Sequence, residues 1–162
     1  MKRGQLLAQP FIYISTLIVA ALIIIFGVRG IATINEERQN IELTTFITSL
    51  RDNVNTYYNF DEGSLKKLNL PLPENVNEVC FYNKDKQINA PTDEIVKTLM
   101  ELDTINNVFL LPLGENIKSE FNIPNLKNIN DNPLCIKVKG KLNAVIETKI
   151  ETNKVYVEIK NG

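Results

Sequence analysis

The chain has 162 residues, with 18 basic and 19 acidic side chains, a formal net charge of -1 and no histidine. This length leaves room for one modest domain and one membrane segment, and the balanced charge argues against a nucleic-acid partner. Histidine is the commonest general base and metal ligand in proteins. Because this sequence has none, we expect a non-catalytic protein without metal or cofactor. The many asparagines indicate a biased genome or a loop-rich surface.

An uncharged, mostly apolar stretch runs from Gln5 to Val28. At about 1.5 Å per residue it forms a helix of about 36 Å, which exceeds the hydrocarbon thickness of about 30 Å. We therefore expect a transmembrane helix over residues 5–30. A cleavable secretory signal is one alternative, although its apolar core is usually only about 7 to 15 residues long. A buried helix is the other, but it would need a much larger protein around it.

Basic residues flank this stretch on both sides: Lys2 and Arg3 precede it, and Arg29 and Arg38 follow it. Charge counting favours a cytoplasmic N-terminus only slightly. Residues 1–4 leave no domain to translocate at that end. We expect the partner of the apolar stretch to be the lipid bilayer, with residues 31–162 as an extracytoplasmic α+β domain.

Apolar residues recur at spacings of three and four beyond the predicted membrane helix: Leu43, Phe46, Ile47, Leu50, Val54, Tyr57 and Tyr58. This stripe is typical of a helix that packs by one face. Proline and glycine are absent between Ile31 and Phe60, and Gly63 provides a stop. The pattern predicts a helix that continues from the membrane into the domain, and the alternative is a short hinge at the polar stretch "NEERQN".

Prolines bracket two short apolar runs that we predict as strands, Glu78 to Tyr82 and Val108 to Leu111. Between them, "PTDEIVKTLMELDT" predicts a short helix. Thr92 can cap this helix, and Asp93 and Glu94 favour its positive end. Its expected buried face consists of Ile95, Leu99 and Leu102.

Strict alternation of apolar and polar residues near the C-terminus predicts a three-stranded antiparallel meander. Its apolar positions are Ile136 and Val138, then Leu142, Ala144 and Ile146, then Val155, Val157 and Ile159. Turns are expected at Lys139-Gly140-Lys141 and near Thr152-Asn153. The predicted fold class is α+β, with a long N-terminal transmembrane helix that continues into a helix packed on a small antiparallel sheet.

Several side chains are candidates for a site. Cys80 and Cys135 lie in predicted strands and form either a disulfide or two free core thiols; we favour the bridge, because oxidation is permitted outside the cell. Lys66 and Lys67 follow Gly63 and Ser64, so they form either an anion contact or a solvated turn. Tyr57 and Tyr58 can stack on a ligand, but packing between helix and sheet explains at least one of them.

"KRGQ" stands directly before a long apolar helix that runs on into an antiparallel sheet, and this arrangement resembles archaeal type IV pilins and pilin-like proteins. The resemblance implies that a prepilin peptidase cleaves after Gly4, with Arg3 before the cut and Gln5 as the new N-terminus. It also implies assembly with other pilin-like subunits. The family usually has glutamate at the fifth mature position, which aligns neighbouring subunits, whereas this chain has Gln9.

A second resemblance covers the middle of the chain. "EGSLKKLNLPLPENVNEVCFYN" resembles a group of uncharacterised, singly anchored membrane proteins of small-genome archaea, which has no activity to transfer. Together these patterns favour a non-catalytic, membrane-anchored surface protein of pilin-like build, either a minor pilin or a pseudopilin-type structural subunit. The alternative is a stand-alone anchored module that recruits a binding partner and does not polymerise.

Overall fold

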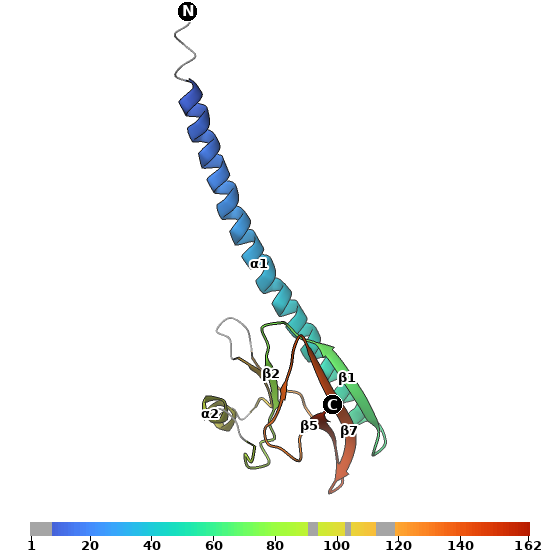
Figure 1. The fold of residues 1–162 in the computed structure, drawn as a ribbon. Coiled ribbons are helices and arrows are strands. Elements are labelled where there is room, and N and C mark those ends of the chain that lie inside the picture. Colours follow the sequence, from blue (N-terminus) through green and yellow to red (C-terminus); the bar gives the residue numbers. More distant parts are fainter. Residues whose placement is uncertain (1–7, 91–93, 103–104, 113–118) are drawn as a thin grey trace, which may run out of the picture. The chain divides into compact units, whose positions relative to one another are not determined.

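The computed structural model describes residues 8–90, 94–102, 105–112 and 119–162. The chain divides into two compact units, Met1–Gln39 and Asn40–Gly162. In chain order its elements are α1 (Ala8–Tyr58), β1 (Leu65–Pro71), β2 (Glu78–Phe81), α2 (Glu94–Leu102), β3 (Val108–Leu111), β4 (Glu120–Phe121), β5 (Leu126–Lys127), β6 (Leu134–Lys137), β7 (Lys141–Glu151) and β8 (Lys154–Asn161) (Figure 1).

Helix α1 contributes residues to both units. All of residues 8–58 are helical, including the polar stretch 35–40 that the sequence offered as a hinge. The stripe predicted on the second half of α1 is confirmed, because its members line one hydrophobic core: Leu43, Phe46, Ile47, Leu50 and Val54 are buried, and Tyr57 and Tyr58 pack at the core's margin. Each fully buried Leu or Phe stabilises the fold by about 1.5 to 3 kcal/mol.

Two four-stranded sheets complete the second unit, with strand orders β1-β7-β8-β5 and β4-β3-β2-β6. Because side chains alternate between the two faces of a strand, every second residue of each sheet enters the core shared with α1. The first sheet contributes Leu68, Leu70, Leu142, Ala144, Ile146, Val157 and Ile159. The second sheet contributes Val79, Phe81, Val108, Leu110 and Ile136. The fold is therefore α+β, as predicted.

The predicted meander is wrong in one of its strands. β7 and β8 form the expected antiparallel hairpin, and Thr152 and Asn153 make its turn with φ angles of 51° and 61°. β6, however, pairs with β2 in the other sheet. Two hydrogen bonds hold the link between β6 and β7 against the connection that follows β1: Val138 N donates to Asn77 O, and Leu72 N donates to Gly140 O. Gly140, at φ 67°, lets the chain cross between the sheets there.

Strands β2 and β3 lie within one residue of their predicted bounds, whereas β1 and the short strands β4 and β5 were not predicted. Among the described strands, β1 pairs with β7 alone, so it forms an edge of its sheet. Charged side chains are ordinary on an edge strand, which is why "LKKLNLP" carries little strand signal. The sheet is also not wholly antiparallel, because β5 pairs with β8 in parallel.

Helix α2 lies on the other face of the second sheet. Val96 and Met100 are buried there against Cys80 and Phe109. The predicted buried face is wrong at Leu102, which is 75% exposed, while Leu99 is half-buried. Val96 and Met100 are four residues apart and so lie on the same face of the helix. The buried face therefore begins at Val96, one residue after the predicted start at Ile95. Thr92, Asp93 and the side chain of Ile95 lie outside the described residues.

A cluster of charges occupies the face of β7 and β8 that points away from the core. Glu147 and Glu158 are direct neighbours across the two strands. Lys160 Nζ lies 2.6 Å from Glu147 Oε2 and 3.0 Å from Glu158 Oε2, and Lys149 Nζ lies 2.6 Å from Glu147 Oε1. Hydrogen bonds from Lys149 and then Lys160 hold the pKa of Glu147 below its usual value of 4.5. The same bonds to Glu147 and Glu158 raise the pKa of Lys160.

Replacing Lys160 by methionine is expected to make the fold less sensitive to acid. The ion pairs of Glu147 stabilise the fold above pH 4.5, and this contribution is lost as pH falls through the depressed pKa of the folded protein. Between roughly pH 5 and pH 3, urea unfolding should therefore show a loss of stability that is about 0.5 kcal/mol smaller in Lys160→Met than in the wild type. Lys67→Met, which removes an exposed lysine of β1, should keep the wild-type profile. Equal acid sensitivity of both variants would contradict the role of the cluster.

Candidate functional site

Helix α1 contains one segment, Phe11–Ile31, that is long and apolar enough to cross a membrane by length and composition. This apolar segment is not buried inside the protein. The side chains of Ser15 and Thr16 bond within the helix: Ser15 Oγ donates to Ile12 O at 2.9 Å, and Thr16 Oγ1 donates to Tyr13 O at 2.9 Å. Such bonds satisfy hydroxyl donors where no water is present, so both residues are compatible with a lipid environment.

The residues implied in processing and assembly fall at the start of the chain. Arg3, Gly4 and Gln5 lie outside the described residues. Gln9 belongs to α1, but its side chain lies outside them too. The expected cleavage after Gly4 and the expected role of Gln9 therefore stay predictions.

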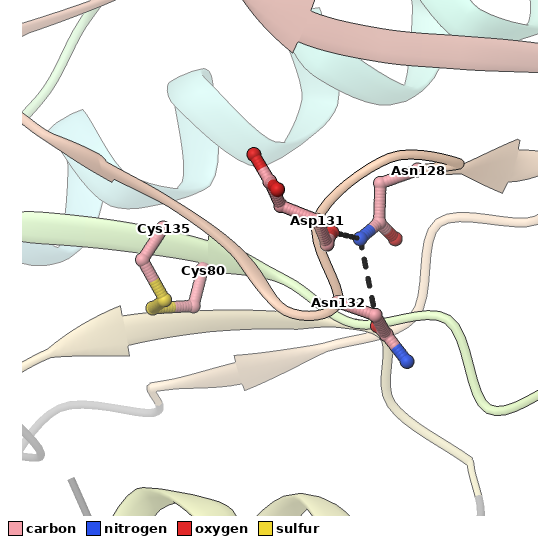
Figure 2. The surroundings of a disulfide bond; sticks show 5 residues. All are labelled: Cys80, Asn128, Asp131, Asn132 and Cys135. Atoms are coloured by element: carbon pink, nitrogen blue, oxygen red, sulfur yellow. Dashed lines mark hydrogen bonds between the residues drawn. A yellow bond between two sulfur atoms is a disulfide. The ribbon is translucent and has the colours of Figure 1, made fainter. Parts of the chain in front are cut away.

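The structure joins the two cysteines in a disulfide, with an S–S distance of 2.02 Å. Cys80 in β2 and Cys135 in β6 are direct partners in the strand register, and their Cα atoms are 4.0 Å apart. Figure 2 shows the bridge beside the loop that leads into β6. Cys80 is fully buried among the residues that contact α2. The bridge thus links two neighbouring strands on the α2 side of the second sheet.

A group of asparagines joined by hydrogen bonds, here called the asparagine clamp, consists of Asn83, Asn89, Asn128 and Asn132. The side chain of Asn132 is central: its Nδ2 donates to Asn83 O at 2.9 Å and to Lys86 O at 2.8 Å, and its Oδ1 accepts from Asn83 N at 2.8 Å. The backbone of Asn132 completes the contact, donating to Asn89 Oδ1 and accepting from Asn89 N. The clamp therefore fastens the loop after β2 to the loop before β6.

Asn128 supports Asn132 from the same loop. Its Nδ2 donates to Asp131 O and, at 3.4 Å, to Asn132 Oδ1, as Figure 2 shows. Asn83 in turn donates from Nδ2 to Asn128 O. Asn83, Asn128 and Asn132 are at most 6% exposed, so the prediction of a loop-rich surface is wrong for these three. Their environment depends on contacts between distant loops, and the Asn132-Pro133 dipeptide was the only local turn signal.

Lys66 and Lys67 do not share a site. Both lie in β1 rather than in the turn that the sequence favoured, and they pair with Ile146 and Val145 of β7. Successive side chains of a strand point to opposite faces, so the two ammonium groups diverge. Lys66 Nζ lies 6.0 Å from the centre of the Tyr57 ring, within cation–π range. Tyr57 also contacts Phe60, with ring centres 5.0 Å apart.

One hollow in the domain, here called the tyrosine pocket, has a volume of about 510 Å³. Tyr58 from α1, Tyr82 after β2 and Tyr156 from β8 line it. The remaining lining comes mainly from the loop after β2, the segment around β5 and the turn between β7 and β8. The asparagine clamp holds the first of these loops. Tyr58 was noted in the sequence as a candidate ligand contact, whereas Tyr82 and Tyr156 were not.

The lining of the tyrosine pocket contains an ion pair between Lys127 and Asp85. Lys127 Nζ lies 2.7 Å from Asp85 Oδ2 and 5.9 Å from the centre of the Tyr156 ring. The hydrogen bond from Lys127 lowers the pKa of Asp85. Burial raises the pKa of Tyr156, so its hydroxyl stays protonated at neutral pH and can both donate and accept a hydrogen bond.

Within the described residues, no group of three or more His, Cys, Asp or Glu side chains has an arrangement that could hold a metal ion. No family model, curated protein or solved structure matches the chain. The class of the protein is therefore defined by its own features: an α+β domain with a disulfide, preceded by a helix that is long and apolar enough to span a membrane.

Proposed function

We propose that the chain is a non-catalytic, membrane-anchored surface protein of pilin-like build. The observation that carries this proposal is α1, which combines two chemically different parts in one helix. Phe11–Ile31 is apolar and unburied, whereas the stripe from Leu43 to Val54 is covered by the sheets of its own domain. A helix that anchors in lipid and also forms part of the core of a soluble domain is the build of a pilin subunit.

In this proposal the N-terminus is cytoplasmic and the domain lies outside the cell. Lys2 and Arg3 favour retention of the N-terminal end in the cytoplasm. The disulfide supports the same orientation, because bridges persist in oxidising surroundings. The bilayer is one partner of the chain, and a prepilin peptidase and other pilin-like subunits are the protein partners.

A stand-alone anchored module is the second candidate function. It is favoured by Gln9, which replaces the glutamate that aligns subunits in the resembled family. An amide can hydrogen-bond but cannot form an ion pair with the terminal amine of a neighbouring subunit. Such a module would use the same anchor and recruit a partner through its domain without polymerising.

Co-expression with an archaeal prepilin peptidase is expected to remove residues 1–4 and leave Gln5 at the N-terminus. The small side chain of Gly4 allows the scissile backbone to extend in the peptidase active site. Mass spectrometry of the membrane-extracted protein measures the new terminus directly. Gly4→Val should block the cleavage, and a catalytically inactive peptidase provides the matched control.

An intact N-terminus in the presence of the active peptidase would contradict the pilin-like proposal and leave the anchored module. Where cleavage occurs, sheared surface fractions separate two roles. Protein in the sheared fraction supports a filament subunit, whereas cleaved protein found only in the membrane supports a pilin-like protein that does not polymerise.

A further inference from the structure

The hydroxyl groups of the tyrosine pocket lack partners within the part of the chain that the structure describes. The hydroxyls of Tyr58, Tyr82 and Tyr156 make no hydrogen bond with any described residue. Tyr156 is notable because its side chain is only 6% exposed, yet its hydroxyl oxygen keeps contact with solvent in the pocket. The Tyr156 hydroxyl is therefore open to a hydrogen bond with a molecule in the pocket.

Three asparagine amides add to this set. Asn122, Asn125 and Asn153 line the pocket, are exposed, and make no side-chain hydrogen bond with any described residue. Asn125 and Asn153 adopt left-handed backbone conformations, with φ angles of 63° and 61°. Asn83 and Asn107 differ, because their amides are used by backbone groups of the domain. The amides of Asn83 and Asn107 therefore stabilise the domain, whereas those of Asn122, Asn125 and Asn153 can bond to a ligand.

Four charged side chains line the pocket, namely Lys84, Asp85, Lys127 and Lys154. Lys127 is paired with Asp85 at 2.7 Å. Lys154 is the direct cross-strand neighbour of Glu151 at the hairpin turn. The phenol and amide groups of the pocket each supply both donors and acceptors. A ligand hydroxyl also donates and accepts, so it matches these groups better than a carboxylate or a phosphate, which only accept.

We propose that the tyrosine pocket binds a neutral carbohydrate. A sugar ring offers hydroxyls at its edge for the phenol and amide groups, and apolar C–H faces for the rings of Tyr58, Tyr82 and Tyr156. The volume of about 510 Å³ is in the range of small-molecule sites, which is about 300 to 1,000 Å³. This binding role goes beyond the proposed anchoring function and does not depend on processing or polymerisation.

Saturation-transfer NMR on the full chain tests the proposal, in a detergent without a sugar headgroup. The probes are glucose, galactose, mannose, fucose and N-acetylglucosamine at millimolar concentration, with glucuronate and inorganic phosphate as anionic counterparts. At least one neutral sugar is expected to receive saturation from the protein. Tyr156→Phe, which removes one hydroxyl and keeps the ring, should weaken that sugar's affinity about fivefold.

Tyr57→Phe is the matched control, because Tyr57 does not line the pocket, and it should leave the affinity unchanged. Asn122→Ala should also weaken binding about fivefold, so the test survives if Tyr156→Phe does not fold. No transfer to any neutral sugar would overturn the proposal. It would equally be overturned by binding of glucuronate or phosphate alone, or by neutral-sugar binding that both pocket variants leave unchanged.

Discussion

Replacing Asn132 by alanine is expected to lower the free energy of unfolding by about 4 kcal/mol. The Asn132 side chain bonds to three backbone groups at 2.9 Å or less, namely Asn83 N, Asn83 O and Lys86 O, and its Nδ2 also donates to Gln87 O at 3.3 Å. Asn132 is 1% exposed, so alanine leaves these groups without a replacement partner. Each unsatisfied buried group costs about 1 to 3 kcal/mol, although part of the loss is recovered where a loop opens to water. Urea unfolding of the full chain in micelles, followed by tyrosine fluorescence, measures the change.

Asn143→Ala is the matched control for this substitution. Asn143 is exposed on β7, and its side chain makes one hydrogen bond, at 3.0 Å from Asn69 Nδ2. Its loss should change the free energy of unfolding by no more than about 0.5 kcal/mol. If Asn132→Ala were as mild as Asn143→Ala, the clamp would not be the feature that holds the two loops together.

Loss of the disulfide is expected to destabilise the domain by a similar amount. Cys80 and Cys135 are separated by 55 residues, and closing a loop of that length stabilises a fold by about 4 kcal/mol in the chain-entropy model. The double variant Cys80→Ala, Cys135→Ala should therefore show a lower urea midpoint than the oxidised wild type. Alanine is used because Cys80 is fully buried, where a serine hydroxyl would add its own cost.

Reductant provides an internal control for the disulfide prediction. It should lower the urea midpoint of the wild type toward that of the double variant and leave the double variant unchanged. Quantitative alkylation of both cysteines in unreduced, freshly unfolded protein from the native host would show that the bridge is not formed there. That result would also remove the support that the disulfide gives to an extracytoplasmic domain.

Local patterns in the sequence determined much of the secondary structure. The spacing of Leu43, Phe46, Leu50 and Val54 depends only on the helical period, and the same residues line the core. Alternation along residues 141–161 likewise predicts the β7–β8 hairpin, because one residue in two must face the core. The apolar segment Phe11–Ile31 can be identified from composition alone, because the criteria for a helix that could span a membrane are only its length and its apolar side chains.

Tertiary structure alone decided the strand pairing and the candidate sites. Alternation shows which side chains of β6 face inward, but not that its partner is β2, because that choice depends on bonds such as Val138 N to Asn77 O. In the sequence, Asn132 cannot be distinguished from an exposed loop asparagine. Its stabilising hydrogen bonds form only because the folded chain brings residues 83–89 beside it. The tyrosine pocket arises in the same way: Tyr58, Tyr82 and Tyr156 lie in three separate elements, and long-range packing brings them together.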